Sequence, residues 1–195
     1  MAVDQSRRQR RALMGGLAMG AGLALVGCAT EPTPPLLVNA QLAEADGSSA
    51  AGEGGRPAHW RIDGKPTRMT PDRALARAAG TTWRVEFDGA GPYAGIVQAL
   101  PIEAVRGRRL ALAADLARSG ADPAVGLWIR AFDADRKSIA YANSYQQPAA
   151  APPAFTRHEL QFEVPQEARA VLVGASIYGA AGAMWIGPLQ LRAQR

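Results

Sequence analysis

The 195-residue sequence has few of the residues that build disulfide frameworks and metal centres. It contains one cysteine and two histidines. A single cysteine excludes an intrachain disulfide framework and any zinc site with several cysteine ligands. Two histidines exclude a metal centre with three histidine ligands. The rest of the composition, 48% apolar with 21 glycines and 14 prolines, suits a loop-rich globular protein.

The common catalytic motifs are also missing. The sequence has no G-x-S-x-G elbow, no H-E-x-x-H and no P-loop. A nucleophilic triad would need His59 or His158 beside an activated serine or cysteine. His158 is in phase with Leu160 and Phe162, so we expect it to be packed, and we place His59 at the surface. No pair of acids stands out, although any two acids can meet in a fold. We expect a protein that is not an enzyme and has no cofactor.

The amino terminus has the pattern of an export signal. Arg7, Arg8, Arg10 and Arg11 precede residues 12–27, which carry no charge. This run is shorter than the roughly 20 apolar residues of a transmembrane helix. A basic region followed by a short apolar run is typical of a secretory signal peptide. We therefore assign residues 1–27 to a signal or anchor helix.

The signal ends in Leu25-Val26-Gly27-Cys28, which resembles the lipobox of bacterial lipoproteins. The small residue gives the signal peptidase access to the backbone, and the thiol is the nucleophile that is acylated. The resemblance implies lipidation at Cys28, with palmitate-type chains that anchor the protein to a membrane. The alternative is a buried cysteine at the end of an anchoring helix.

The export route and the destination follow from the neighbouring residues. Arg10-Arg11-Ala12-Leu13-Met14 resembles a twin-arginine motif, but clustered arginine is also normal in general secretory signals, so both routes stay open. Residues 28–35 hold three prolines and predict an extended tether. Ala29 occupies the position where aspartate retains lipoproteins at the inner membrane in some bacteria. We therefore expect the cell envelope, facing the periplasm, with the outer membrane favoured.

The net charge of +5 does not indicate nucleic-acid binding. The chain has 22 basic and 17 acidic residues. Residues 1–27 contain four arginines and one aspartate, which leaves 18 basic and 16 acidic residues in the remainder. The basic character belongs mostly to the signal, so we expect no nucleic-acid partner.

Residues 36–195 predict an all-β domain, an antiparallel β-sandwich. Trp83, Val85 and Phe87 alternate with charged residues, which is the pattern of a half-buried strand. Further strands are predicted, by alternation or by apolar residues in both phases, at residues 110–116, 124–132, 159–164, 171–178 and 184–191. Turn-forming residues separate them, as in sandwiches. Residues 70–79 are ambiguous, because Pro71-Asp72 could open a short helix.

Six segments occur in an order that is typical of one family of sandwiches. They are Asn39-Ala40-Gln41-Leu42 with Trp60 as opening strand and first tryptophan, Tyr93 to Leu100, Arg106 to Leu112, Gly126 to Arg130 with the turn Asp133-Ala134-Asp135, Phe155-Thr156-Arg157 with Val164-Pro165 and Ala168, and Ala183 to Ile186 as final strand. This ordered set resembles the galactose-binding-like jelly-roll domains, the fold of many carbohydrate-binding modules. The resemblance covers residues 36 to about 193 and implies a jelly roll with a carbohydrate-binding role.

One position departs from the family pattern. Related domains usually follow the final tryptophan with an aspartate pair that often helps to hold calcium, and here Gly187 and Pro188 stand there. We therefore expect no metal site. Pro188 has no N–H to donate and predicts a bulge or an edge. Asp133-Ala134-Asp135 lacks the other ligands of a calcium loop and predicts a hairpin turn.

Aromatic and planar polar side chains supply the candidate ligand site. Sugar rings stack their C–H faces on tryptophan and tyrosine, while amides and guanidinium groups bind the hydroxyls. The candidate residues are Trp128, Arg130, Tyr141, Asn143, Tyr145 and Gln146. The alternative places Trp128 in the core, since its strand is apolar in both phases, and the polar residues in a plain loop. Trp60, Trp83 and Trp185 are assigned to the core.

Two functions remain open. The first is an envelope-anchored, non-catalytic module that binds a carbohydrate or a similar polar ligand. The second is a structural or assembly lipoprotein that contacts another envelope protein and binds no small ligand. An open groove lined by Tyr145, Arg130 and amides would favour the first function, and a flat exposed apolar patch would favour the second.

Overall fold

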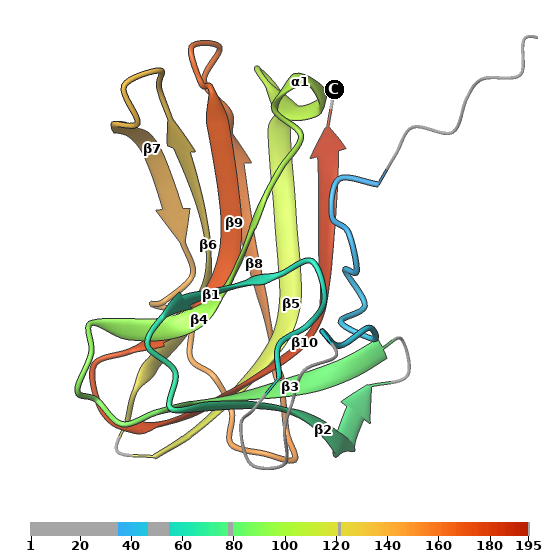
Figure 1. The fold of residues 1–195 in the computed structure, drawn as a ribbon, viewed down its shortest axis with the longest axis vertical. Coiled ribbons are helices and arrows are strands. Elements are labelled where there is room, and N and C mark those ends of the chain that lie inside the picture. Colours follow the sequence, from blue (N-terminus) through green and yellow to red (C-terminus); the bar gives the residue numbers. More distant parts are fainter. Residues whose placement is uncertain (1–34, 47–54, 78–79, 121, 195) are drawn as a thin grey trace, which may run out of the picture. The chain divides into compact units, whose positions relative to one another are not determined.

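In the part of the chain that the structure describes, ten strands pair into two five-stranded antiparallel sheets, which is the predicted β-sandwich (Figure 1). The first sheet has the order β1-β4-β9-β6-β7, and the second has the order β2-β3-β10-β5-β8. In chain order the strands are β1 (Arg61–Gly64), β2 (Arg68–Arg77), β3 (Gly80–Phe87), β4 (Tyr93–Ala99), β5 (Arg109–Gly120), β6 (Ala124–Phe132), β7 (Ser138–Asn143), β8 (Thr156–Glu163), β9 (Ala170–Tyr178) and β10 (Gly182–Gln194).

The computed structural model describes residues 35–46, 55–77, 80–120 and 122–194. One short helix, α1 (Ile102–Val105), joins β4 to β5. None of the helices in those ranges has the length and hydropathy of a membrane span. The predicted signal peptide, the lipidation site at Cys28 and nearly all of the tether lie outside the described residues.

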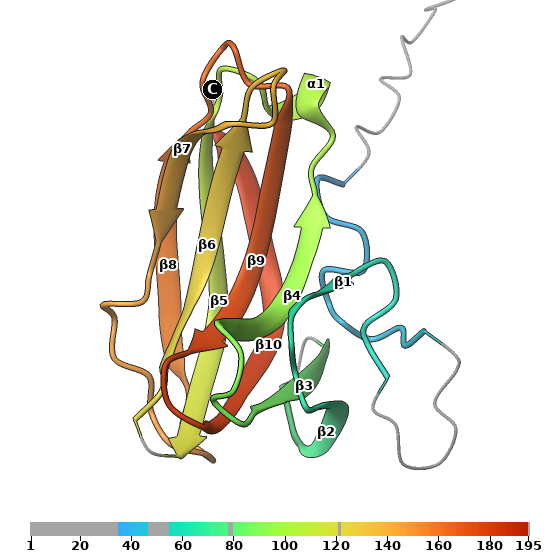
Figure 2. The same ribbon diagram turned by 60° about the vertical axis from the view of Figure 1, so that its left-hand side comes forward.

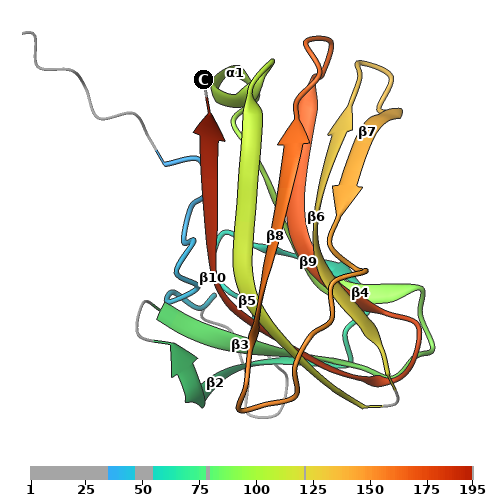
Figure 3. The same cartoon turned by 180° about the vertical axis from the view of Figure 1, so that it is seen from behind.

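The two sheets face each other across an apolar core. Figure 2 shows β7, β6, β9 and β4 of the first sheet side by side, and Figure 3 shows β10, β5 and β8 of the second. Alternation assigns one face of each strand to this core, as predicted. The core includes Ile96 of β4, Leu127 and Ile129 of β6, Val173 and Ile177 of β9, Trp83 and Val85 of β3, Leu110, Leu112 and Leu116 of β5, Leu160 and Phe162 of β8, and Met184 and Ile186 of β10.

The ambiguous segment is a strand, not a helix. Pro71 is on β2, opposite Trp83 of β3. Because β2 is an edge strand of the second sheet, the missing N–H of the proline is tolerated there. The Asp72 carboxylate accepts the N–H groups of Ala74 and Leu75 at 3.1 and 3.2 Å. These bonds lie where the register between β2 and β3 shifts. The aspartate that suggested a helix start therefore stabilises a bulge.

Two predicted irregularities are confirmed. The pairing of β10 with β5 shifts between Ile186 and Leu189, so Pro188 sits in a bulge. The turn between β6 and β7 is closed by Asp133, whose carboxylate accepts the N–H groups of Asp135 and Lys137 at 3.0 and 2.9 Å. This is a hydrogen-bonded hairpin turn, as the sequence predicts.

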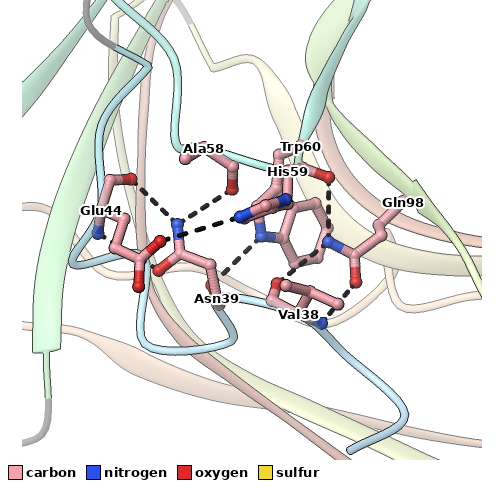
Figure 4. A network of polar contacts seen from close by, with 7 residues as sticks. All are labelled: Val38, Asn39, Glu44, Ala58, His59, Trp60 and Gln98. Atoms are coloured by element: carbon pink, nitrogen blue, oxygen red, sulfur yellow. Dashed lines mark hydrogen bonds and ion pairs between the residues drawn. The ribbon is translucent and has the colours of Figure 1, made fainter.

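The opening segment differs from the prediction. Residues 36–41 form bends and turns instead of a strand, and Asn39 has a φ of 50°, a conformation that asparagine tolerates better than most residues. The Asn39 amide donates to the carbonyls of Glu44 and Ala58 at 2.9 and 3.0 Å. Side-chain hydrogen bonds thus replace the ladder that a strand would make (Figure 4).

Gln98 of β4 fixes the same segment from the sheet side. Its Oε1 accepts the N–H of Val38 at 2.9 Å, and its Nε2 donates to the carbonyls of Val38 and His59 at 3.0 Å each (Figure 4). Gln98 is buried, so these bonds have little competition from water. We call this group the Gln98 clamp. His59 itself is exposed, as predicted.

The three tryptophans that the sequence assigns to the core divide between two clusters. Trp60 and Trp83 are 1% exposed and belong to the inter-sheet core, as predicted. Trp185 is also buried, but it packs outside the inter-sheet core, on the other face of the second sheet, in a small cluster with Ala117 and Ala183. Its Nε1 donates to the Asp72 carboxylate at 2.9 Å. Trp185 is therefore a core residue, as predicted, but it belongs to a second, smaller cluster.

Candidate functional site

The register of the first sheet lines up side chains in rows on its outer face. Because the side-chain period is two, residues of one phase face the core and their neighbours face outward. The outward rows run across the strands as Asp63, Gly95, Ser176 and Gly126, then Val97, Gly174, Trp128 and Asn143, then Leu172, Arg130 and Tyr141.

Two glycines in these rows let aromatic rings lie on the backbone. A Cβ atom at Gly174 would lie 2.7 Å from two ring carbons of Trp128. A Cβ atom at Gly126 would lie 2.6 Å from a ring carbon of Tyr145. Each ring thus lies directly on the strand backbone, because the glycine beneath it has no side chain. The absent side chains leave a hollow in the sheet surface.

This hollow is an open groove with a volume of about 530 Å³. Five of the six predicted residues line it. Gln146 does not, because it lies beside a separate hollow with Arg118 and Ala149. The residues that line the groove are Asp63, Pro92, Tyr93, Trp128, Arg130, Phe132, Tyr141, Asn143, Tyr145, Leu172, Ser176 and Tyr178.

A turn at the end of β7 explains why Tyr145 enters the groove and Gln146 does not. The Asn143 side chain accepts the N–H of Tyr145 at 3.1 Å, which ends the strand. Tyr145 then folds back over Gly126. Simple alternation along residues 141–146 does not predict this reversal, which leaves Gln146 outside the groove.

All four tyrosines of the chain line the groove, although the sequence places them on different segments. Tyr141 and Tyr178 are 43% and 36% exposed. Tyr93 and Tyr178 are direct partners across β4 and β9. The sequence prediction missed Tyr93 and Tyr178, because only the register of strands distant in sequence brings them to Tyr141 and Tyr145.

Tyr145 is held as a wall of the groove. Its hydroxyl is 2.8 Å from the Ser176 Oγ, and its ring meets that of Tyr178 edge-on, with centroids 4.7 Å apart. Burial raises the pKa of Tyr145, an effect that the Ser176 hydrogen bond only partly opposes. The phenol therefore stays neutral at any physiological pH.

Trp128 forms part of the floor. It is 7% exposed and lies outside the inter-sheet core. The two interpretations of Trp128, as a core residue and as a ligand-site residue, therefore both hold in part, because the ring is buried but faces the groove. Its contact with a ligand is limited to a small area.

The charged groups of the groove stand on different strands. Asp63 of β1 accepts the Tyr93 hydroxyl at 3.1 Å. Burial raises the pKa of Asp63, and the Tyr93 hydrogen bond opposes that rise. Arg130 of β6 lies over the Tyr141 ring, 4.5 Å from its centroid. The pairing of a cation with a ring face is stabilising.

These groups supply the chemistry of a polar ligand site. Exposed rings offer stacking surfaces, and Asp63, Asn143 and Arg130 offer hydrogen-bond acceptors and donors. Asp63 is the single carboxylate among the described residues that line the groove, whereas hydrolysis of a glycosidic bond generally uses two. In the part of the chain that the structure describes, no three His, Cys, Asp or Glu side chains gather as metal ligands would.

Comparisons with known proteins identify the fold. No protein-family model matches the sequence, and no curated protein matches it significantly. Among solved structures, the C-terminal family 22 carbohydrate-binding module of Clostridium thermocellum xylanase 10B superposes with a TM-score of 0.53 at 14% identity, over 70% of this chain and 86% of that one. A family 4 carbohydrate-binding module gives 0.53 at 10% identity, over 80% and 99%. The chain has the fold of carbohydrate-binding modules.

A third similar structure is larger. The enzymatically active domain of tailspike protein 4 of bacteriophage CBA120 superposes with a TM-score of 0.53 at 16% identity, over 70% of this chain. This chain spans about a fifth of that protein, 20% of its length. The shared feature in each case is the β-sandwich, which confirms the fold class that the sequence predicts.

A buried serine–histidine pair supports the turn that places Tyr145. The N–H of Leu127 donates to the Ser144 Oγ at 2.9 Å, and that oxygen is 3.0 Å from the Nδ1 of His158. The Ser144 hydroxyl can still donate or accept, since its oxygen has a second lone pair, so the tautomer of His158 decides which of the two groups donates. The other ring nitrogen, Nε2, is buried with no hydrogen-bond partner among the described residues. His158 is fully buried, as predicted.

We expect the protein to lose stability in mild acid because of His158. Burial lowers the pKa of His158, and backbone groups of Ser144 and Pro148 oppose this only in part. The unfolded chain therefore binds a proton near pH 6.5 that the folded protein takes up only at lower pH. As the pH falls between these two values, the free energy of unfolding should fall by up to about 1.4 kcal/mol per pH unit.

The test compares urea unfolding of the native protein and His158→Gln from pH 7.5 to 5. The native curve should decline below pH 6.5 relative to that of the variant. His59→Gln is the matched control, because His59 is exposed, and its curve should follow the native one. Parallel curves for the native protein and His158→Gln would contradict the assignment.

Proposed function

We propose that this chain is a non-catalytic carbohydrate-binding module carried by an envelope-anchored lipoprotein. One observation carries the binding role: all four tyrosines of the chain line a single open groove together with Trp128 and Arg130. Tyrosine presents an apolar face and a polar tip, which matches the mixed surface of a sugar. The fold shared with carbohydrate-binding modules supports the same role.

The exposed tyrosines supply most of the proposed contact. Tyr141 and Tyr178 are accessible, whereas Trp128 is largely covered. The C–H faces of sugar rings would stack on the two tyrosines, and their hydroxyls would bond to Asp63 and Asn143. In the family 22 module that shares this fold, amino acids of the cleft have a role in ligand binding. That role supports a groove as the place of binding here.

The lipoprotein part of the proposal rests on the sequence. Leu25-Val26-Gly27-Cys28 has the pattern of a lipobox, and Cys28 is the sole cysteine. A lipid at Cys28 would hold the module at the membrane surface of the cell envelope, facing the periplasm. With Ala29 after the cysteine, we propose the outer membrane as its location.

We expect Tyr141→Ala and Tyr178→Ala each to weaken glycan binding about tenfold, the effect of losing one stacking contact. Both side chains are exposed, so the free energy of unfolding should change little. The measurement is a screen of cell-wall and exopolysaccharide fragments with the full-length protein, followed by titration of tryptophan fluorescence. The control is Ile62→Ala, an exposed apolar residue that does not line the groove.

Two results would contradict this function. If no fragment changes the fluorescence or binds in the screen, the assembly role replaces the binding role. If a fragment binds but both tyrosine variants bind it as well as the native protein does, the groove is not the binding site.

A further inference from the structure

Arg130 is a half-buried cation without an acidic partner. Its Nε is completely buried and has no hydrogen-bond partner within the described part of the chain. Its guanidinium rests on the Tyr141 ring at 4.5 Å, and the described residues offer it no salt bridge. A charge with unmet donors in a partly dry site is costly unless a ligand compensates it.

Arg84, the other arginine that stacks on an aromatic ring, also has a buried Nε with no hydrogen-bond partner among the described residues, but it differs in its acidic partner and in its location. Arg84 lies over Trp185 at 5.3 Å from the ring centroid, and its Nη2 is 3.4 Å from the Glu86 carboxylate. Arg84 lines none of the described hollows. Of these two arginines, Arg130 alone combines an open groove with the lack of a carboxylate.

Asp63 forms no salt bridge with Arg130, although the Arg130 charge lowers the pKa of Asp63 slightly against the larger effect of burial. Their backbones lie on β1 and β6, which are separated by β4 and β9. The Asp63 carboxylate is engaged by the Tyr93 hydroxyl instead. The groove thus has an acceptor at the β1 side and a cationic donor at the β6–β7 side.

We propose that the groove selects an acidic polysaccharide, in which a uronic acid places its carboxylate on Arg130. The planar guanidinium can donate two parallel hydrogen bonds to a carboxylate, and both groups are charged. A neutral sugar would bring only hydroxyls and would leave the cation uncompensated. On the neighbouring strand β7, Tyr141 pairs with Arg130 and Asn143 pairs with Trp128, and both would contact the same sugar ring. This inference rests on the proposed glycan-binding function.

The experiment uses two polymers that differ only in charge. Polygalacturonate and its carboxyl-reduced counterpart, a neutral galactan with the same linkages, are titrated into the full-length protein by calorimetry. Dextran sulfate tests for attraction to any polyanion. We expect polygalacturonate to bind at least about tenfold more tightly than the reduced polymer, the effect of one charge-assisted bidentate contact. This preference should shrink as salt is raised.

Three variants assign the preference to Arg130. Arg130→Gln removes the charge and should bring both polymers to the same affinity. Arg130→Lys keeps the charge but lacks the planar guanidinium that donates two parallel hydrogen bonds, so it should retain only part of the preference for polygalacturonate. Arg84→Gln is the matched control and should bind as the native protein does. Circular dichroism of each variant reports whether it folds, and Arg130→Lys carries the test if Arg130→Gln does not.

The outcomes separate this inference from the proposed function. Equal binding of both polymers by the native protein overturns the acidic preference and leaves the module function standing. Binding of dextran sulfate as tight as that of polygalacturonate, unaffected by Arg130→Gln, also overturns it. Binding of neither polymer, together with an empty glycan screen, overturns both proposals.

Discussion

Replacing Gly174 by alanine should reduce the free energy of unfolding by about 3 kcal/mol, the upper range for overpacking a tight site. The added Cβ would lie 2.7 Å from the Trp128 ring and would also meet the carbonyl oxygen of Ile96 on β4. The ring could tilt away, but the carbonyl belongs to a central pair of strands. Strands β4 and β9 would have to separate, and Trp128 would leave the groove floor.

The measurement is urea unfolding of the purified variant, with the midpoint and the slope reported together. Gly91→Ala is the matched control, because a Cβ atom there would make ordinary contacts of 3.5 Å or more. That change should alter the free energy of unfolding by well under about 1 kcal/mol. A Gly174→Ala protein as stable as the control would show that Trp128 does not press on the strand.

Replacing Cys28 by serine should abolish lipid attachment completely. A serine hydroxyl is a far weaker nucleophile than a thiolate, and the chain has no second cysteine. Without acyl chains, the stable membrane anchoring that two lipid chains provide is lost. In bacteria fed an alkyne-tagged fatty acid, the native protein should carry the tag and Cys28→Ser should not.

The control for this experiment is Ala29→Ser, which leaves the cysteine in place and should still be tagged. Mass spectrometry of the native protein should show a chain that begins at an acylated Cys28. A native protein that keeps its first residues and a free thiol would contradict the lipoprotein proposal.

The strands were predictable where one phase is polar. In β3 and β8 charged residues occupy the outer phase, so alternation alone places Trp83 and Phe162 in the core. In β6 both phases are apolar, and alternation cannot tell which phase faces inward. Trp128 faces outward because Gly174, on a strand more than 40 residues away, leaves room for its ring. The same ambiguity applies to β10, which is apolar in both phases, and there Trp185 is buried in the smaller core cluster with Ala117 and Ala183.

The site was predictable where its residues are neighbours in the sequence. Arg130 and Tyr141 belong to one hairpin, so a local reading brings them together. Asp63, Tyr93 and Tyr178 reach the groove through the pairing of β1, β4 and β9. That pairing depends on the whole inter-sheet core, which no local pattern encodes.

The Gln98 clamp limits the distance between the groove and a lipid anchor at Cys28. Val38 is bonded to the sheet on both its N–H and its carbonyl, so the chain is firmly attached from that point onward. If Cys28 carries the proposed lipid, the short stretch of residues 28–35 would be the tether, with a span of about 25 Å if extended at 3.1 Å per residue. The domain would then sample a thin layer next to the bilayer and would meet those polymers that lie within it.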